Sequence, residues 1–267
     1  MRILTVMAVV STALAASVAF AHDDDNDGQG RGTAVTACGT VIDRPGKYFL
    51  ANDLIECPGN GIEIRSSRVE LKLRGHAITS GNASGTGIDL AGGSTGLRGI
   101  EIEGPGVVFG FAVGVAFVNV QRSVMKGVTV TGNDFGVGVN RFFSPGPVFD
   151  TESTGNRFKD NVVTGNIFHG ITSNGGNRNL YEGNHFSNNG SFGLYLFDAV
   201  GNRARKNVAT QNQTGIVIQA DTGIDNDIRG NIALGNRSPF DLRDDNLNCD
   251  GNDWSNNLGR SNKDCVE

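Results

Sequence analysis

The chain has 267 residues, of which 38% are hydrophobic and 19% are charged, and its formal net charge at pH 7 is −5. This length and apolar content suffice for one folded domain with a sizeable core. The acidic balance disfavours nucleic acid and anionic membrane surfaces as partners, because both bind proteins through a basic footprint.

The N-terminal segment, residues 1–21, has the pattern of an export signal. Met1-Arg2 is a basic start, an apolar run continues to Ala16, and Ala19-Phe20-Ala21 supplies the small residues that a signal peptidase reads. A membrane anchor is the alternative, but the apolar run is short for a membrane span and no longer one follows. We therefore expect a secreted or periplasmic protein without a membrane span, whose mature chain begins at His22.

The next segment, residues 22–37, is acidic and rich in glycine. Asp23, Asp25, Asp27 and Gly28 match the first positions of a calcium loop, but Ala34 stands where such a loop needs a bidentate Glu. The composition therefore predicts a solvated, disordered segment over residues 22–37, followed by one folded domain over residues 38–267.

Short strands and a fixed repeat dominate this domain. Val69-Glu70-Leu71-Lys72-Leu73 alternates apolar and charged residues, as a half-buried strand does, and no helical period is sustained anywhere. In the second half, a pattern of three asparagines with four residues between neighbours recurs at steps of 23, 23 and 24 residues. The four copies are Asn156–Asn166, Asn179–Asn189, Asn202–Asn212 and Asn226–Asn236. A period of this length predicts a solenoid, in which no single repeat buries a core alone.

One coil of the predicted solenoid carries an insertion. Asn133 and Asn166 are 33 residues apart, about ten more than in the later coils, and the irregular sequence Arg141–Ser153 lies between them. Insertions in solenoids leave the body as loops and often form the binding face.

The chain has four cysteines: Cys38, Cys57, Cys249 and Cys265. Three pairings are possible in principle. In a long solenoid the two ends lie far apart, which leaves Cys38–Cys57 and Cys249–Cys265 as the reasonable pairs. No Cys-x-x-Cys spacing occurs, which disfavours zinc binding and redox catalysis.

These features resemble the right-handed parallel β-helix repeat proteins of the pectate-lyase-like superfamily. The resemblance covers about Cys38 to Cys265, and its N-terminal mark is Cys38-Gly39-Thr40, then Pro45–Leu50, Gly61–Ile64 and Gly75–Ile78. It implies coils of three short strands, with like side chains stacked into ladders, to which the asparagine positions are suited. We expect an all-β, single-stranded right-handed parallel β-helix of about seven or eight coils with disulfide-stapled ends. Many activities share this scaffold, so the fold alone does not decide the function.

A flat β face of such a solenoid can lie along an extended sugar chain. One outward column is predicted to contain Asp89, Ala116, Thr172, Tyr195, Val217 and Asp241. Neighbouring members should lie about 4.8 Å apart, so that Tyr195, beside Thr172, could stack on a sugar ring. The alternative is an ordinary exposed column of mixed residues.

If the protein is an enzyme, a lyase or epimerase of uronic polymers is favoured over a hydrolase. Such an enzyme needs a base for the C5 proton and a cation for the carboxylate. The candidate bases are His169 and Tyr195, and Arg141 is the candidate cation. Hydrolysis needs two carboxyl groups across one bond, and no such pair is evident beside His169.

Three charged residues complete the candidate substrate-binding set with Thr172. Asp150 and Glu152 belong to the inserted loop, and Lys159 is a second candidate cation. The alternative for all of them is a surface loop with ordinary charges.

Asp198, Asp221 and Asp244 follow the strands at steps of 23 residues and predict a vertical carboxylate column. Stacked carboxylates repel one another, and Ca²⁺ held by oxygen ligands would relieve that repulsion. The alternative is that Asp is a favoured turn residue in every coil.

The leading hypothesis is an exported solenoid that binds an extended, uronic polysaccharide along one strand face and, as an enzyme, cleaves or epimerises it. The alternative is a non-catalytic structural or adhesive surface solenoid. A periplasmic metal-handling accessory is a third, but four His and three Met are few for copper handling. The sequence does not indicate an oligomeric state.

Overall fold

The computed structural model describes residues 32–140, 153–219, 223–249 and 251–266. They belong to one compact unit, Gly32–Glu267. In these residues the secondary structure consists of 29 strands and the short 3₁₀ helix η1 (Leu247–Cys249). None of the helical structure in the described ranges is long and apolar enough to cross a membrane.

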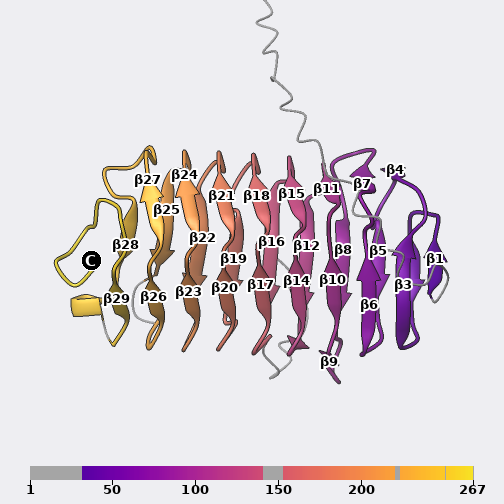
Figure 1. Ribbon diagram of the computed structural model, residues 1–267, viewed down its shortest axis with the longest axis horizontal. Coiled ribbons are helices and arrows are strands. Elements are labelled where there is room, and N and C mark those ends of the chain that lie inside the picture. Colours follow the sequence, from indigo (N-terminus) through magenta and orange to yellow (C-terminus); the bar gives the residue numbers. More distant parts are fainter. Residues whose placement is uncertain (1–31, 141–152, 220–222, 250, 267) are drawn as a thin grey trace, which may run out of the picture. The chain divides into compact units, whose positions relative to one another are not determined.

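Nearly all strands lie in three parallel sheets, and successive coils add strands to each sheet in turn (Figure 1). Sheet A contains β1 (Thr33–Val35), β3 (Gly46–Leu50), β6 (Val69–Lys72), β10 (Glu101–Glu103), β14 (Val124–Lys126), β17 (Arg157–Lys159), β20 (Leu180–Glu182), β23 (Arg203–Arg205), β26 (Asp227–Arg229) and β29 (Asp253–Ser255). Sheet B contains β2 (Thr40–Ile42), β5 (Ile62–Ile64), β8 (Thr86–Ala91), β12 (Val113–Val118), β16 (Phe135–Asn140), β19 (Ile171–Asn174), β22 (Phe192–Phe197), β25 (Thr214–Ile218) and β28 (Leu242–Asp244). Sheet C contains β4 (Leu54–Cys57), β7 (Ala77–Ser80), β11 (Val107–Phe109), β15 (Thr129–Thr131), β18 (Val162–Thr164), β21 (His185–Ser187), β24 (Val208–Thr210) and β27 (Ile232–Leu234). The short strands β9 (Leu97–Arg98) and β13 (Val120–Gln121) pair at the turn from sheet B to sheet A.

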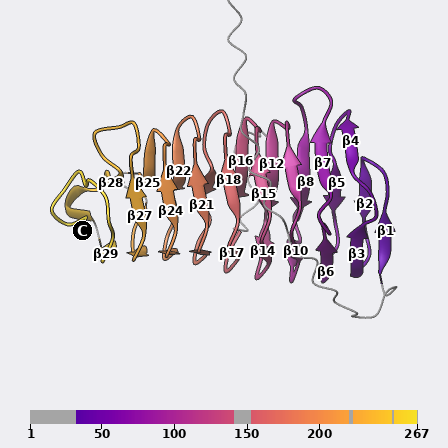
Figure 2. The same ribbon diagram turned by 45° about the horizontal axis from the view of Figure 1, so that its top comes forward.

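This arrangement confirms the predicted parallel β-helix. Sheets A, B and C hold ten, nine and eight strands, respectively. This makes about nine coils, slightly more than the seven or eight expected. Figures 1 and 2 show the coils stacked in chain order, from β1 at one end to β29 at the other. The fold begins earlier than the predicted boundary at Cys38, because β1 pairs with β3 and buries Val35. Residues 1–31, which include the predicted export signal, lie outside the described ranges.

The core is formed by the inward side chains of all three sheets. In one coil, Tyr181, Phe186, Leu194 and Leu196 are completely buried, and the residues beside them on the strands face outward. Parallel pairing places like residues above one another, so that the rings of Phe158 and Tyr181 stack with centroids 5.2 Å apart. Each coil thus completes the core of the next, as the repeat predicts.

Three ladders of buried asparagines tie the coils together at the turns. Each ladder is a chain in which one asparagine donates to the side-chain oxygen of the asparagine in the next coil. The ladders contain Asn156, Asn179, Asn202, Asn226 and Asn252; Asn161, Asn184, Asn207, Asn231 and Asn257; and Asn133, Asn166, Asn189, Asn212 and Asn236. The ladders satisfy the buried turn backbone, which would otherwise lack partners.

Asn184 shows what one ladder residue does. Its Oδ1 accepts hydrogen bonds from the backbone N–H and the side-chain amide of Asn161, at 3.1 and 3.0 Å. Its Nδ2 donates to the carbonyl oxygen of Phe158 at 2.8 Å and to Oδ1 of Asn207 at 3.0 Å. One side chain therefore satisfies polar groups of two other coils.

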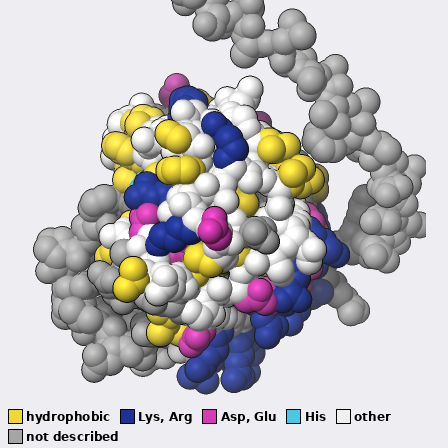
Figure 3. All heavy atoms as spheres, turned by 90° about the vertical axis from the view of Figure 1, so that its left-hand side faces the viewer, with side chains coloured by type: hydrophobic (Ala, Val, Ile, Leu, Met, Phe, Trp, Pro, Cys, Tyr) yellow, Lys and Arg dark blue, Asp and Glu magenta, His cyan; other side chains and the backbone are white. Residues whose placement is uncertain are grey.

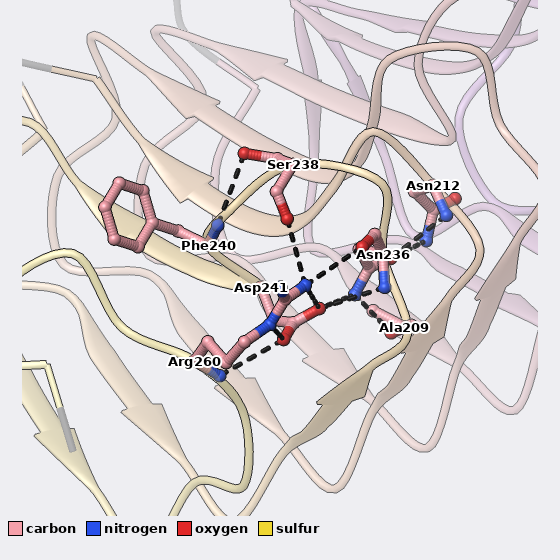
Figure 4. A network of polar contacts seen from close by, with 7 residues as sticks. All are labelled: Ala209, Asn212, Asn236, Ser238, Phe240, Asp241 and Arg260. Atoms are coloured by element: carbon pink, nitrogen blue, oxygen red, sulfur yellow. Dashed lines mark hydrogen bonds and ion pairs between the residues drawn. The ribbon is translucent and has the colours of Figure 1, made fainter.

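The ladder that begins at Asn133 ends on a carboxylate (Figure 4). Oδ1 of the buried Asp241 accepts from the backbone N–H and the amide of Asn236, at 3.0 and 2.9 Å. Nε of Arg260 donates to Oδ2 of Asp241 at 2.7 Å, and the same guanidinium reaches the carbonyl oxygens of Asn236 and Ser238. Asp241 and Arg260 thus cap the ladder where no further asparagine follows.

Both predicted disulfides are present. Cys38 bonds Cys57 in the first coils, with Cα atoms 5.4 Å apart. Cys249 bonds Cys265 at the other end, with Cα atoms 6.3 Å apart. The bonds close loops at the two ends, where a terminal coil has a neighbour on one side only.

The inserted coil keeps its register with the coils on both sides. Val130 pairs with Val163 across the insertion, and Val163 pairs with Phe186 in the coil after it. The coils on the two sides of the insertion are therefore stacked as neighbours despite the extra residues between β16 and β17. Arg141 to Glu152 lie outside the described ranges, which resume at Ser153.

Asn184→Ala is expected to lower the free energy of unfolding by about 2–4 kcal/mol, because it leaves a buried N–H of Asn161 and a buried carbonyl of Phe158 without partners. Urea unfolding followed by circular dichroism measures this loss. His185→Ala, at the exposed neighbouring position in β21, should change it little. Equal losses for the two variants would contradict the structural role of the ladder.

Asp241 is expected to make stability depend on pH in the acid range. Burial alone raises the pKa of Asp241, but hydrogen bonds from Arg260 and Asn236 outweigh burial and hold the pKa below its ordinary value. The ionised carboxylate therefore stabilises the fold above the unfolded pKa of about 3.9, and this contribution is lost as the pH falls through the lowered folded pKa.

Asp241→Asn should thus melt at a lower temperature than the wild type at pH 7, and the difference should shrink below about pH 4. Thermal unfolding of both proteins between pH 3 and pH 7 measures it. A difference that is the same at every pH would exclude this role for the carboxylate.

Candidate functional site

Six aromatic side chains gather on the outer surface of sheet B, and we call them the aromatic face: Phe135, Phe168, His169, Phe192, Tyr195 and Phe197. They come from β16, from β22 and from the turn before β19, which are parts of three successive coils. All six are partly or fully exposed. Phe135, His169 and Phe192 follow the axis of the solenoid, one in each coil, whereas Tyr195 and Phe197 extend the aromatic face along β22, across the axis.

The rings contact one another along the whole row. Phe135 and Phe168 stack with centroids 4.7 Å apart, and His169 and Phe192 stack at 5.0 Å. Tyr195 lies 5.2 Å from His169 and 5.0 Å from Phe192, and Phe197 continues the row 6.2 Å beyond Tyr195. These separations are typical of aromatic pairs that stabilise each other.

A column of glycines makes this arrangement possible. Along β22, Tyr195 and Phe197 face outward and Leu194 and Leu196 face inward, as strand alternation requires. Strand alternation is interrupted at the start of β22, where Gly193 and Leu194 are both buried and Phe192 faces outward. Gly193 lies against the backbone of the next coil. A Cβ at Gly193 would be 2.6 Å from the carbonyl oxygen of Gly215, and one at Gly170 would be 2.5 Å from that of Gly193. The glycine that follows His169 in the sequence thus has a packing role.

His169 lies at the centre of the aromatic face and is neutral at physiological pH. Burial among the rings lowers its pKa to about 4. Its Nδ1 accepts a hydrogen bond from the backbone N–H of Phe192 at 3.3 Å, which leaves the proton of the neutral ring on Nε2. His169 is therefore a flat, uncharged ring that can act as a hydrogen-bond donor.

Tyr195 also keeps its phenolic proton at physiological pH. Burial raises its pKa, the charge of Asp245 raises it further, and the charge of Arg243 partly opposes this effect. Arg243 and Asp245 form a two-point ion pair beside it, with both N–O distances at 2.7 Å. Together, His169 and Tyr195 present neutral rings with polar edges, which suit stacking and hydrogen bonding.

Near neutral pH, the pKa values of His169 and Tyr195 do not suit either residue to abstract a proton. An efficient base has a pKa close to the working pH, whereas the pKa of His169 lies well below it and that of Tyr195 well above it. The catalytic roles of His169 and Tyr195 stay predictions, and the arrangement favours binding.

The structure separates the other predicted site residues. Thr172 lies in register with Tyr195, but it is only 2% exposed, so little of it is open to a ligand. Lys159 lies on sheet A, where it pairs with Glu182 at 3.2 Å. The predicted roles of Arg141, Asp150 and Glu152 cannot be placed, because these residues lie outside the described ranges.

The predicted outward column is correct as far as Val217 and differs after it. The register runs from Asp89 through Ala116, Gly138, Thr172, Tyr195 and Val217 to Arg243. Arg243 takes the place expected for Asp241, because the last coil is longer than the one before it and pairs Val217 with Arg243. Asp241 is buried and caps the asparagine ladder instead.

The same longer coil changes the predicted carboxylate column. Asp244 lies in register with Ile218 and Leu196, so it is not above Asp198. Its buried carboxylate accepts hydrogen bonds from Asn246, Asn252 and Trp254. Asp221 lies outside the described ranges. Calcium binding stays a prediction, and the described residues contain no group of three His, Cys, Asp or Glu side chains that could hold a metal ion.

Sequence reasoning missed most of the aromatic face. It singled out His169 and Tyr195 but not Phe135, Phe168, Phe192 or Phe197. A signal was present, because Phe192 follows His169 by one period of 23 residues. It also missed the acidic pair on β5 and β8, where Asp89 lies in register with Glu63. Burial, with the charge of Glu63, raises the pKa of Asp89 to about 6.

Comparisons with known proteins show one matching family and several solved structures with a similar fold. The family model described as periplasmic copper-binding protein (NosD) matches residues 35–262. Among solved structures, the A-module of the mannuronan C-5 epimerase AlgE4 of Azotobacter vinelandii is 14% identical with a TM-score of 0.56, covering 85% of this chain and 74% of that one. The Dettilon tailspike protein is 17% identical with a TM-score of 0.53, covering 76% of this chain and 43% of that one.

The enzymatically active domain of tailspike protein 2 of bacteriophage CBA120 is also similar, at 14% identity and a TM-score of 0.50, and the match covers 82% of this chain and 42% of that one. The chain thus spans less than half the length of both tailspike chains. No sequence among curated proteins matches it. At these identities the structural similarity shows the fold alone.

The chemical shift of the His169 Cε1 proton should report a pKa of about 4, because the surrounding rings disfavour the charged imidazole. Phe192→Ala removes one stacked ring and should move this pKa upward, towards the ordinary value of about 6.5. NMR titration between pH 3 and pH 8 measures both proteins. A wild-type midpoint near the ordinary value would contradict the buried environment of His169.

Proposed function

The chain belongs to the family of periplasmic copper-binding proteins (NosD), and from this premise we propose that it is an exported solenoid that binds an extended polysaccharide along the aromatic face. The family description places its members in the periplasm, and the two disulfides are compatible with an oxidising compartment.

The neutral rings of the aromatic face, which span three successive coils, carry this proposal. The C–H faces of a pyranose are apolar, so each ring of the row can remove one such face from water. Because the rings come from three successive coils, they can contact successive sugars of one chain. A compact ligand would use only part of the row.

Polar groups beside the rings complement the hydroxyl groups of a sugar chain. Asn140 and Asn174 lie in register with Phe197 at the ends of β16, β19 and β22. Carboxamides both donate and accept hydrogen bonds, as sugar hydroxyls do. Apolar surface with a few placed polar groups is the usual composition of a ligand site.

The similar structures add a class of polymer to test. One of them is a mannuronan C-5 epimerase module. Because that similarity concerns the fold alone, mannuronan enters here as a test ligand and supports no assignment of residues.

Copper has no part in this proposal, because the described residues do not fit it. Protein copper sites use thiolate, thioether and imidazole ligands. All four cysteines are in disulfides, and Met125 is completely buried in the core. His169 lies in the aromatic face, and His76 contacts Asp53 at 3.0 Å. These side chains lie apart on the coils, and none forms a three-ligand group within the described part of the chain.

Binding is tested by calorimetric titration of the protein with polymannuronate, polygalacturonate and a neutral glucan. We expect measurable affinity for at least one polymer and a loss of roughly tenfold in Tyr195→Ala, because a central aromatic contact contributes more than about 1 kcal/mol. Phe109→Ala removes an exposed ring from sheet C and is the matched control.

Two results would overturn the proposal. One is the absence of binding to every polymer, which would favour the alternative of a structural or adhesive solenoid. The other is equal affinity in the wild type and Tyr195→Ala, which would place the ligand elsewhere on the surface. Melting temperatures of both variants show whether each is folded.

A further inference from the structure

A row of arginines lies on another part of the solenoid, at the turns that lead from sheet B into sheet A. Arg122, Arg157, Arg178 and Arg203 supply one exposed guanidinium group to each of four successive coils. Figure 3, which looks onto the end of the solenoid, shows Lys and Arg side chains gathered along the lower edge of the molecule. We call the surface around these four residues the arginine groove.

The register of the coils sets the spacing of the row. Arg157 and Arg203 belong to one column, with Leu180 between them. Arg122 and Arg178 belong to the neighbouring column, which precedes the first by two residues and has Gly155 between them. Since neighbouring strands lie about 4.8 Å apart, the four charges follow a zigzag that advances by one strand spacing per coil.

Glycines in the row leave room for the arginine side chains. A Cβ at Gly155 would lie 3.8 Å from Cγ of Arg122, and one at Gly201 would lie 3.5 Å from Cγ of Arg178. Each of these arginine stems thus extends over the glycine of the next coil. The result is a continuous hollow of about 620 Å³ lined by residues that include Arg157, Arg178 and Arg203, with a smaller hollow beside Arg122 and Arg157.

Among the described residues, the four guanidinium groups have no acidic partner, unlike the other cations on the strands of sheet A. In the column that follows that of Arg157 by two residues, Lys126 pairs with Glu101, Lys159 with Glu182, and Arg205 with Asp227. In the described part of the chain, Arg122, Arg157, Arg178 and Arg203 form no ion pair. Four like charges at short spacing repel one another, and an anionic ligand would relieve this repulsion.

Acidic residues mark the end of the row beyond Arg203. In the coil after Arg203, the two column positions are occupied by Asp225 and Asp227. In the coil before Arg122, Glu101 stands in the column of Arg157. The other column continues past Arg122 through Gly99 to the exposed Arg68, so negative charge bounds the positive surface only beyond Arg203.

From this geometry we infer that the arginine groove binds a linear acidic polysaccharide through about four successive anionic units. Guanidinium groups bind carboxylate or sulfate oxygens with two parallel hydrogen bonds, and a regular polymer offers one such group at each unit. A single-stranded nucleic acid fits less well, because the described residues that line the groove include no aromatic side chain on which bases could stack.

This inference goes beyond the proposed function, since the arginine groove and the aromatic face are different surfaces and either could bind without the other. The arginine groove would bind a polymer through its negative charges, whereas the aromatic face would bind one through the apolar faces of its sugar rings. Variants of one surface should leave binding at the other unchanged.

The test uses the full chain and fluorescently labelled oligosaccharides of about eight units, one a polyuronate and one sulfated, with fluorescence anisotropy at low salt. We expect at least one of them to bind, and Arg157→Gln/Arg203→Gln to weaken that binding at least tenfold. Both residues are strand residues with ordinary backbone angles, so the double variant should fold normally. Added salt should weaken wild-type binding more than that of the variant, because ionic contacts are screened.

Three controls make the outcome decisive. Arg44→Gln removes an exposed charge in the first coils and should leave the affinity unchanged. Phe109→Ala removes an exposed ring that lies outside both surfaces and should also leave the affinity unchanged. The inference is overturned if neither acidic oligosaccharide binds, if the double variant binds as the wild type does, or if single-stranded DNA of equal length binds as tightly.

Discussion

Hydrogen bonding by buried asparagine side chains is the constraint on which the rest of the structure depends. A solenoid must turn its backbone three times in each coil, and the groups at those turns point inward, where water cannot reach them. Each ladder asparagine accepts from one coil and donates to others, as Asn184 does between Asn161, Asn207 and Phe158. The turns of these coils are buried because each coil places an asparagine at the same position, and in an earlier coil Ser123 accepts the equivalent hydrogen bond from Ile100.

This constraint fixes the register of the outer surface as well as of the core. When the ladders align the coils, residues with equal places in the repeat lie one strand spacing apart on the outside. Phe135, His169 and Phe192 of the aromatic face form a row of this kind, and the arginine groove combines two such rows. The ion pairs of sheet A form another, in which Lys126, Lys159 and Arg205 are each matched to an acid. A solenoid thus turns a sequence period into surface rows of repeated chemistry.

The two candidate surfaces differ in how their side chains are satisfied. In the aromatic face, the rings contact one another, and burial keeps His169 uncharged. In the arginine groove, the charges lie over glycines and lack acidic partners among the described residues. The first surface suits the apolar faces of sugars, and the second suits their acidic substituents. A polymer with both features could in principle use either surface.

The sequence by itself determined the fold, the two disulfide pairs and the place of the insertion, because a repeat with regular asparagines permits one kind of stacking. It also singled out His169 and Tyr195 as candidate site residues, and the structure brings their ring centroids to 5.2 Å from each other. It did not determine the end of the outward column, since the extra residues of the last coil lie between Asn236 and Leu242, after the fourth copy of the asparagine pattern. Only the tertiary structure decided that Asp241 is buried and that Arg243 faces outward. Likewise, the arginine groove spans two alternating columns, so its charges become neighbours only when the coils are stacked.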